Sequence, residues 1–476
     1  MIDVKEYKNA EKVFTFFEEI SKIPHGSENT EKIADYLVNF AEERKLWHTR
    51  DAANNVIIRK TATKGYENRP TVIFQGHTDM VADKVKGCPI DLDKEGLKIF
   101  RDEDFIRAKG TTLGGDDGVA IAYALAVLDS NDIEHPEFEA LFTSDEEIGL
   151  IGATALDTSL LKGKTMINID SDVEGVFTVG CAGGMRIDVN MPMRRKKAKK
   201  HIYKISVSGL KGGHSGTEID KGRINAIKTL VDIITEIPDM GISSISGGNA
   251  DNAIPRSAEA IISVYFDEQD DYAKEYLIDK TIAAIIDKEP DVKITLEELF
   301  GDYYVFTESE TGRLLRFIKT LPNGVVKMSD DIPGLVETSA NLGIISSDEK
   351  GITCSLSIRS SNNAEKEKLR KKIREIAEFN DGIVGERGAY PAWEYKKDSH
   401  LRDVMRETYV DMYGKEPEII TIHAGLECGI FSEKIEGLDC VSIGPDNFDI
   451  HTPDERLSIS STARVWDYLK EVLKKI

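Results

Sequence analysis

The 476-residue sequence has few cysteines and no long apolar run. Its five cysteines are odd in number and none belongs to a Cys-x-x-Cys pair, which excludes a disulfide framework and a cysteine zinc site. No apolar stretch is long enough to span a bilayer, and residues 1–6 show no charged-then-apolar signal region. These absences predict a cytoplasmic protein without a membrane partner.

Negative charge outweighs positive charge in the sequence. The chain has 62 basic and 84 acidic residues, a formal net charge of -22. Nucleic acids and anionic membranes bind positively charged surfaces, so we expect neither as a partner. One basic run, at residues 193–200, departs from this pattern, and we interpret it as a solvated loop or strand edge because the chain around it is acidic.

The order of expected strands and helices predicts an α/β domain that is interrupted by an insertion. Short apolar runs that suit buried strands lie at residues 56–59, 71–75, 138–143 and 165–170. They alternate with helix-prone segments, which favours a sheet covered by helices on both faces. After about residue 200 the order becomes strand, amphipathic helix and paired strands, and it then repeats, which indicates an inserted block of two tandem α+β sandwiches. The predicted parts are an N-terminal catalytic part at 1–184, the inserted block at 185–392 and a C-terminal catalytic part at 393–476.

Five short patches rich in acidic residues and histidine stand out. They are Gly76–Asp79, Gly114–Gly118, Ser144–Gly149, Asn168–Asp172 and Asp449–Pro453. Three of them follow apolar strands, and ligands of open α/β sheets gather at the carboxyl ends of strands. Each patch alone fits a solvated turn or a capped helix start equally well. Together, their imidazoles and carboxylates match the ligands of two zinc-like ions and predict a two-metal hydrolase.

Three of these patches indicate divided roles. Of the adjacent Glu146 and Glu147, one can ligate a metal while the other faces the attacking water as a base. One carboxylate of the Asp116-Asp117 pair can bridge two cations, although aspartates are also favoured at helix N-termini. His77 and Asp79 lie two residues apart, so both side chains project to the same side and Asp79 can orient the imidazole.

In this order and spacing, the patches resemble those of the dinuclear-zinc metallopeptidases that include aminoacylase, carboxypeptidase G and bacterial dipeptidases. The resemblance covers nearly the whole chain. Segments 76–81, 110–118 and 423–429 narrow it to the dipeptidase branch. The resemblance implies His77, Asp116 and Asp170 on one zinc ion, and Asp116, Glu147 and His451 on the other. It also implies Glu146 as the general base, Asp79 as the residue that orients His77, and a cis bond between Asp116 and Asp117.

The inserted block carries segments that resemble the family's substrate contacts. Gly209–Gly216 resembles the segment of the lid histidine, which implies that His214 stabilises the oxyanion. Gly248–Pro255 and Ser357–Ser361 resemble the segments that hold the substrate's terminal carboxylate. The resemblance therefore implies that Asn252 and Arg359 contact this carboxylate. Asn249 is close enough in the sequence to take the place of Asn252, and the guanidinium of Arg359 suits bidentate binding. Gly425 is expected to help shape the substrate pocket.

These features predict a zinc-dependent dipeptidase that cleaves unblocked dipeptides, of Xaa-His type and broader, through a metal-bridging water activated by Glu146. We expect two Zn²⁺ ions per chain, although carboxylate-rich sites also accept Co²⁺ or Mn²⁺. The alternatives are a tripeptidase or an N-acyl-amino-acid deacylase on the same scaffold and, from another class, a non-catalytic peptide- or metal-binding protein. A monomer and a homodimer formed through the lid both fit the sequence.

Overall fold

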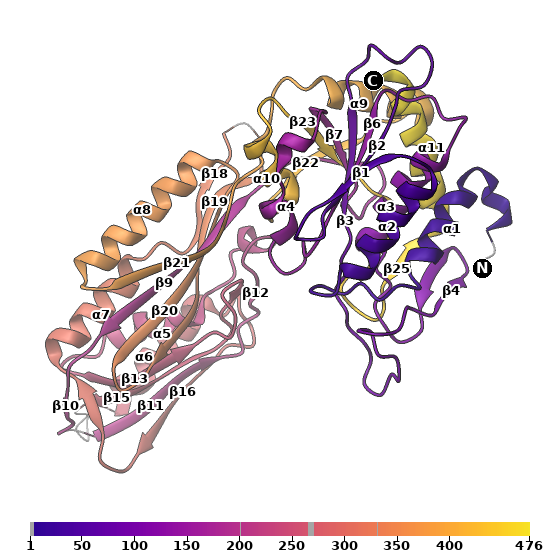
Figure 1. Ribbon diagram of the computed structural model, residues 1–476. Helices are drawn as coiled ribbons and strands as arrows, with labels where there is room; N and C mark the ends of the chain where they lie inside the picture. The colour runs from indigo at the N-terminus through magenta and orange to yellow at the C-terminus, as the bar shows by residue number, and fades with distance from the viewer. Residues whose placement is uncertain (1–3, 200, 265–270, 331) are drawn as a thin grey trace. The chain divides into compact units, whose positions relative to one another are not determined.

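A computed structural model describes residues 4–199, 201–264, 271–330 and 332–476 (Figure 1). The chain divides into two compact units. Unit 1 comprises the residues up to Cys181 together with Tyr395–Thr421 and Leu426–Ile476, and unit 2 comprises Ala182–Glu394 and Ile422–Gly425. Within the described ranges, no helix combines the length and the apolar character needed to cross a membrane.

An eight-stranded sheet forms the centre of unit 1, in the order β1-β2-β6-β3-β7-β23-β8-β22. Its strands are β1 Trp47–Arg50, β2 Val56–Lys60, β3 Val72–His77, β6 Phe138–Thr143, β7 Thr165–Asn168, β8 Val176–Cys181, β22 Glu418–Ile422 and β23 Asp439–Ser442. Neighbours among β6, β3, β7 and β23 are parallel, so their carboxyl ends meet at one edge of the sheet (Figure 1). Every residue of β3 and β6 is buried, as expected for parallel strands covered on both faces.

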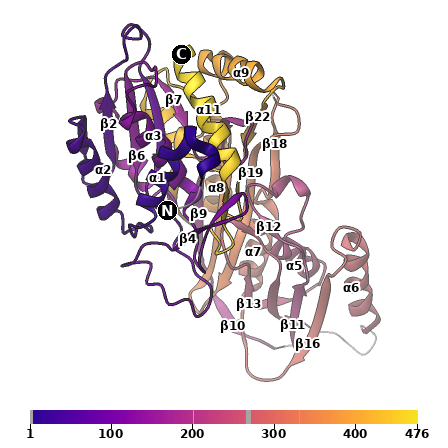
Figure 2. The same ribbon diagram turned by 90° about the vertical axis from the view of Figure 1, so that its right-hand side faces the viewer.

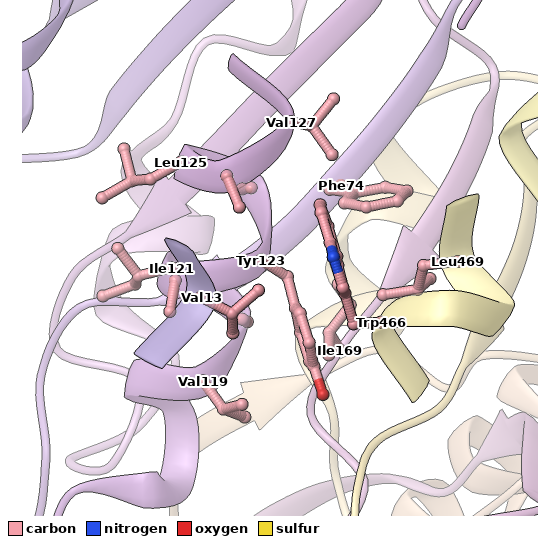
Figure 3. Close-up of a cluster of buried hydrophobic side chains, with 14 of the residues drawn as sticks. Val13, Phe74, Val119, Ile121, Tyr123, Leu125, Val127, Ile169, Trp466 and Leu469 are labelled. Carbon is pink, nitrogen blue, oxygen red and sulfur yellow. The ribbon is translucent and has the colours of Figure 1, made fainter. Parts of the chain in front are cut away.

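Helices cover both faces of this sheet, as the sequence predicts. They are η1 Lys5–Ala10, α1 Glu11–Ile20, α2 Glu31–Glu43, α3 Gly115–Asp129, α4 Ile151–Ala155, η2 Thr158–Leu160, α9 His400–Tyr413, α10 Glu427–Lys434 and α11 Ile459–Lys475. Phe74 of β3 belongs to the apolar cluster in which Tyr123 of α3 stacks on Trp466 of α11, with ring planes 8° apart (Figure 3). The next residue, Gln75, points the other way and donates to Glu427 of α10.

Residues 151–161 form a helix-prone segment, but the helix in the structure covers only its first part. α4 ends at Ala155 because Leu156 adopts an extended backbone, with φ -57° and ψ 132°. The side chain of Asp157 then accepts a hydrogen bond from the Ser159 amide and caps the separate turn η2. A local cap therefore outweighs the helical propensity of the segment.

A second, four-stranded sheet of unit 1 has the order β24-β25-β5-β4. Its strands are β4 Ile99–Asp102, β5 Phe105–Ala108, β24 Asn447–Phe448 and β25 Arg456–Ser458. β25 pairs with β5 through Leu457 and Ile106, so the C-terminal part of the chain is tied to the N-terminal part. The loop between β24 and β25 contains His451.

Unit 2 is built on one sheet with the order β16-β11-β15-β13-β19-β20-β9-β21, in which β18 also pairs with β19. Its strands are β9 Gly183–Pro192, β11 His201–Ser208, β13 Gly241–Gly247, β15 Ala258–Val264, β16 Lys293–Leu299, β18 Gly324–Met328, β19 Val336–Ser347, β20 Gly351–Ser360 and β21 Ile383–Tyr390. The remaining elements are the pairs β10 Arg195–Lys197 with β17 Tyr304–Phe306 and β12 Gly213–His214 with β14 Ala253–Ile254, and the helices η3 Ile219–Lys221, α5 Ala226–Thr235, α6 Asp271–Ile285, α7 Glu308–Thr320 and α8 Asn363–Phe379. α5 and α7 lie side by side against β13 (Figure 2).

The two sandwiches expected in the inserted block share this one sheet. β13, from the first predicted sandwich, pairs with β19 of the second through Gly247 and Ile345. β9, at the start of the block, pairs with β20 and β21 near its end. Joining the halves removes two open strand edges, which otherwise invite pairing with other chains.

The basic run forms the short strand β10 and its flanks. Lys196 lies 2.7 Å from the Glu308 carboxylate and Lys197 lies 2.8 Å from that of Asp302, so acidic neighbours neutralise both lysines. The last residue of the run, Lys200, lies outside the described residues. The structure therefore agrees with the interpretation of this run as a solvated strand edge.

Candidate dinuclear metal centre

The ends of three neighbouring parallel strands bring acidic and imidazole side chains to one edge of the sheet in unit 1. β3 ends at His77, β6 is followed by the turn that carries Glu146 and Glu147, and β7 is followed by Asp170. Asp116 lies at the start of α3, where it departs from helical angles, and the Asp116–Asp117 peptide bond is cis, as the resemblance implied.

Asp116 lies between two imidazoles. Its Oδ1 is 3.1 Å from His77 Nε2, and its Oδ2 is 3.1 Å from His451 Nε2. Asp170 Oδ1 lies 3.9 Å from His77 Nε2, and Glu147 Oε1 lies 2.9 Å from His451 Nε2. The structure thus brings the residues into three overlapping groups, each with its ligand atoms within 4.8 Å of one another: His77, Asp116 and Asp170; Asp116, Glu147 and His451; and His77, Glu146 and Glu147. The first two groups share Asp116 and match the two expected ligand sets.

Burial and mutual contact shift the ionisation of this cluster. Burial raises the pKa of Glu146 to about 8 and raises that of Asp170 well above its usual range. Burial also acts to raise the pKa of Asp116, but hydrogen bonds with His451 and His77 outweigh it and lower the pKa. The hydrogen bonds of His451 with Asp116 and Glu147 raise its pKa to about 10. Burial therefore makes ionisation of Glu146 and Asp170 costly as long as no cation lies beside them.

The residues present fit divalent cations. The side chains of His77, Asp116 and Asp170 are only 1%, 12% and 11% exposed. Asp170 Oδ2 is buried and has no hydrogen-bond partner among the described residues. Buried carboxylates need positive charge or hydrogen-bond donors, and imidazole nitrogens and carboxylate oxygens are the donors that zinc-type ions bind.

Asp79 ties the first patch to the third. Its carboxylate accepts hydrogen bonds from Ser27 Oγ at 2.8 Å and from the amides of Glu146 at 2.9 Å and Glu147 at 3.3 Å. His77 Nδ1 lies 2.9 Å from the main-chain oxygen of Asp79 and 3.5 Å from its carboxylate. Because a carbonyl oxygen only accepts, Nδ1 carries the hydrogen and Nε2 faces Asp116.

Sequence reasoning missed two buried glutamates beside this centre. Glu427, at the start of α10, accepts hydrogen bonds from Gln75 Nε2 and Thr143 Oγ1, each at 2.6 Å, and burial raises its pKa to about 7. Glu455 accepts hydrogen bonds from the glycine-rich turn before Asp116. The apolar neighbours of Glu427 in the sequence are a signal of burial. Glu455 follows the fifth patch by two residues, but the sequence does not indicate its contact with the turn before Asp116.

His214 lies on β12 in unit 2, and its imidazole is held in one tautomer. The amides of Gly216 and Thr217 donate to Nδ1 at 3.3 and 3.2 Å. Nδ1 is therefore the acceptor, and the hydrogen of the neutral ring lies on Nε2, where it can donate. Burial and the charge of Arg359 lower the pKa of His214, which favours this neutral form.

The other expected substrate residues lie near His214 in unit 2. A Cβ on Gly216 would lie 3.0 Å from the His214 ring and 3.2 Å from Arg359 Nε, so these two side chains are close neighbours. Arg359 of β20 donates to the Tyr390 hydroxyl at 3.0 Å, and a side chain at Gly425 would collide with the Tyr390 ring. The main-chain carbonyl of Asn252 accepts a hydrogen bond from the Ser215 amide at 2.8 Å, next to His214 in the sequence.

Comparison with known proteins agrees with this geometry. Residues 73–475 match peptidase family M20/M25/M40. The chain is 36% identical over 475 residues to the cytosol non-specific dipeptidase of Escherichia coli (strain K12), covering 98% of this chain and 97% of that protein. The crystal structure of aminoacylhistidine dipeptidase from Vibrio alginolyticus superposes with a TM-score of 0.92 at 36% identity, over 98% of this chain and 96% of that one.

A more distant structure shares the fold. Aminopeptidase PepT from Bacillus cereus ATCC 10987 has a TM-score of 0.57 at 16% identity, with 98% of this chain and 99% of that chain covered. The family match spans most of the chain, and the relative from Escherichia coli spans nearly all of it. The chain therefore belongs to peptidase family M20/M25/M40.

Proposed function

We propose that this protein is a metal-dependent dipeptidase that cleaves unblocked dipeptides, including those of Xaa-His type. The observation that carries the proposal is the pair of ligand groups that share Asp116, with Glu146 beside them. The names of two relatives, a cytosol non-specific dipeptidase and an aminoacylhistidine dipeptidase, support the substrate class.

The expected metal sites are His77, Asp116 and Asp170 for one ion, and Asp116, Glu147 and His451 for the other. Imidazole and carboxylate ligands make Zn²⁺ the first candidate, and Co²⁺ or Mn²⁺ also suit a carboxylate-rich site. When bound, two such ions polarise the peptide carbonyl and make the attacking water more acidic. Asp79 keeps the turn of Glu146 and Glu147 in place and keeps His77 in the tautomer that presents Nε2.

Glu146 is proposed as the general base. It accepts a proton from the attacking water and delivers it to the leaving amine. Its burial supports this role, because a carboxylate removed from water binds a proton more readily than an exposed one. Glu147 follows it directly in the chain but faces His451, which supports a ligand role for Glu147 instead.

For unit 2 we propose substrate recognition. His214 donates through Nε2 to the oxyanion that forms at the scissile carbonyl. Arg359 binds the free carboxylate of the dipeptide, with Asn252 and Gly425 beside it, and guanidinium suits a carboxylate through two parallel hydrogen bonds. A fixed carboxylate clamp would limit the enzyme to short peptides.

A substrate panel tests the proposal. Purified protein loaded with Zn²⁺ is assayed with Ala-His, β-Ala-His, a tripeptide and an N-acetyl amino acid, before and after chelation. We expect the dipeptides to give the highest kcat/KM and chelation to abolish turnover. Faster turnover of the tripeptide would instead identify a tripeptidase, and faster turnover of the N-acetyl compound a deacylase. Bound metal without any turnover would identify a non-catalytic binding protein.

Two further expectations concern the protein in the cell. We propose a cytoplasmic location, which the word cytosol in the name of the Escherichia coli relative supports. The homodimer formed through the lid stays a prediction, and light scattering on the purified protein distinguishes it from a monomer.

A further inference from the structure

Glu455 binds four consecutive backbone amides with one buried carboxylate. It lies in the loop between β24 and β25, and it is 3% exposed. Its Oε2 accepts from the amides of Leu113 at 2.7 Å and Gly114 at 3.0 Å, and its Oε1 from those of Gly115 at 2.8 Å and Asp116 at 3.3 Å. Asn447 Nδ2, at 3.4 Å from Oε1, completes the set.

The turn before Asp116 needs such an acceptor. Gly114 has a left-handed backbone, with φ +67°, and Asp116 and Asp117 are not helical, so the first turn of α3 is irregular. Amides at the start of a helix have no acceptor within the helix, and the side chain at the N-cap position is absent because that residue is Gly114. Glu455 supplies both the acceptor and a negative charge at the helix N-terminus, where negative charge is stabilised.

The same residue lies close in sequence to a second expected ligand. His451 precedes Glu455 by four residues, and the Glu455 amide donates to the Thr452 carbonyl at 3.1 Å. His451 Nε2 in turn lies 3.1 Å from Asp116 Oδ2. One carboxylate therefore joins the segment that carries Asp116 to the loop that carries His451, although the two segments are more than 300 residues apart in the sequence.

We propose that Glu455 is a positioning residue for the metal centre, which fixes Asp116 relative to His451 so that Asp116 can bridge two cations. The proposal rests on the metal centre described under the proposed function. Glu455 belongs to none of the groups of expected ligands, and it acts through the amide of Asp116. Its removal should therefore weaken metal binding directly, and catalysis only as a consequence.

Gly115 offers an independent way to disturb the same contact. A Cβ at this position would lie 2.9 Å from Asn447 Nδ2 and 3.1 Å from Glu455 Oε1. The backbone of Gly115 does not have a positive φ, so alanine is not strained there by its own conformation. Gly115→Ala therefore pushes the carboxylate away from the turn and leaves the charge of Glu455 in place.

Metal titration of the full-length protein tests the proposal. Four proteins are first freed of metal by chelation: wild type, Glu455→Gln, Gly115→Ala and Asp454→Asn. Binding of Co²⁺ is then measured by visible absorption, and binding of Zn²⁺ by calorimetry. In Glu455→Gln an amide NH₂ replaces one carboxylate oxygen and meets backbone donors. Asp454→Asn is the matched control, because Asp454 is the adjacent residue and its side chain is 83% exposed.

We expect Glu455→Gln and Gly115→Ala to bind Co²⁺ about 10–100-fold more weakly, with an altered absorption band, while Asp454→Asn binds like wild type. Their kcat for Ala-His should fall while KM changes little. Wild-type Co²⁺ affinity and spectrum in both variants would overturn the proposal, even if both melt at lower temperature. If Glu455→Gln does not fold, the Co²⁺ affinity of Gly115→Ala alone decides whether the proposal holds. A wild type that binds Co²⁺ but cleaves no dipeptide would refute the proposed function and leave this test intact.

Discussion

Two adjacent glutamates show how the surroundings of a residue set its chemistry. Glu146 and Glu147 have the same side chain and occupy one turn, and both amides donate to Asp79. Glu147 Oε1 lies 2.9 Å from His451 Nε2, whereas burial raises the pKa of Glu146 to about 8. The turn thus places the Glu147 carboxylate beside the expected ligand His451, whereas the Glu146 carboxylate can accept a proton.

This difference predicts opposite defects for the two amide variants. Glu146→Gln should bind Zn²⁺ like wild type but lose about 10²–10⁴-fold in kcat, because it removes a general base. Glu147→Gln should bind less Zn²⁺, because it removes a ligand oxygen. Metal content by atomic emission and steady-state kinetics with Ala-His measure both effects. Glu28→Gln, an exposed acidic residue whose amide bonds to Asp145 of the same turn, is the control and should match wild type. Equal metal loss in both variants would contradict the division of roles.

His423 predicts a pH-dependent stability. It is buried in unit 2, with Nε2 2.7 Å from Ser339 Oγ, and burial together with the charge of Arg359 lowers its pKa to about 4. The unfolded chain takes up this proton near pH 6.5 and the folded protein only near pH 4. The stability that the neutral ring provides is therefore complete above pH 6.5 and is lost as the pH falls toward 4.

Between pH 7 and pH 5, this loss should amount to about 2 kcal/mol. Urea unfolding of metal-free protein at both pH values measures it as a shift in midpoint, and His423→Gln should show a smaller shift because glutamine does not titrate. Metal-free samples are needed, since acid would otherwise also release metal from unit 1. An identical pH dependence in the two proteins would show that His423 does not carry the effect.

At the level of elements, a buried polar layer lies directly behind the expected metal ligands. Gln75 and Asn168 pair in register on β3 and β7, two residues before His77 and Asp170. Asn168 Nδ2 donates to Gln75 Oε1 at 2.6 Å, and Gln75 Nε2 donates to Glu427. Since side chains two apart on a strand share a face, this layer sets the positions of the ligands above it.

Removing Glu427 should therefore loosen the ends of β3 and β6. Glu427→Leu leaves Gln75 Nε2 without its 2.6 Å partner and removes the strong acceptor of Thr143 Oγ1, at a cost of about 1–3 kcal/mol for each buried group. We expect a lower melting temperature and weaker Zn²⁺ binding, measured by calorimetry. Glu433→Gln, an exposed residue on the same helix α10, should change neither. Unchanged Zn²⁺ affinity in Glu427→Leu would limit the residue to a role in stability.

The polar layer also shows where sequence reasoning reaches its limit. Apolar runs followed by acidic residues located the strand ends near His77, Glu146 and Asp170, because strand ends in a parallel sheet meet at one edge. The bond between Gln75 and Glu427 joins residues 352 positions apart, and no local pattern encodes it. The same limit applies to β13 and β19, whose pairing merges the two predicted sandwiches into one sheet. Periodicity identifies a strand but not its neighbour.

At the scale of the whole molecule, the chain leaves unit 1 after Cys181 and returns at Tyr395. The five expected metal ligands all belong to unit 1, although His451 follows the return and the other four precede the departure. A bound ion would therefore connect distant parts of the chain within one unit. Metal binding is accordingly expected to stabilise unit 1 selectively.

Scanning calorimetry can test this selectivity because two compact units allow two unfolding transitions. Ligand that binds only the folded state adds about 2.7 kcal/mol at a free concentration of 100 times Kd, so Zn²⁺ should raise the transition of unit 1 and chelation should lower it. The melting temperature of unit 2 should stay unchanged.

Two variants serve as controls for this measurement. Leu314→Ala, at a fully buried position in unit 2, identifies the transition of unit 2 by lowering its melting temperature. His451→Ala should abolish most of the Zn²⁺ effect. Equal shifts of both transitions with Zn²⁺ would mean that metal binding couples the units, because ligands confined to unit 1 cannot by themselves stabilise unit 2.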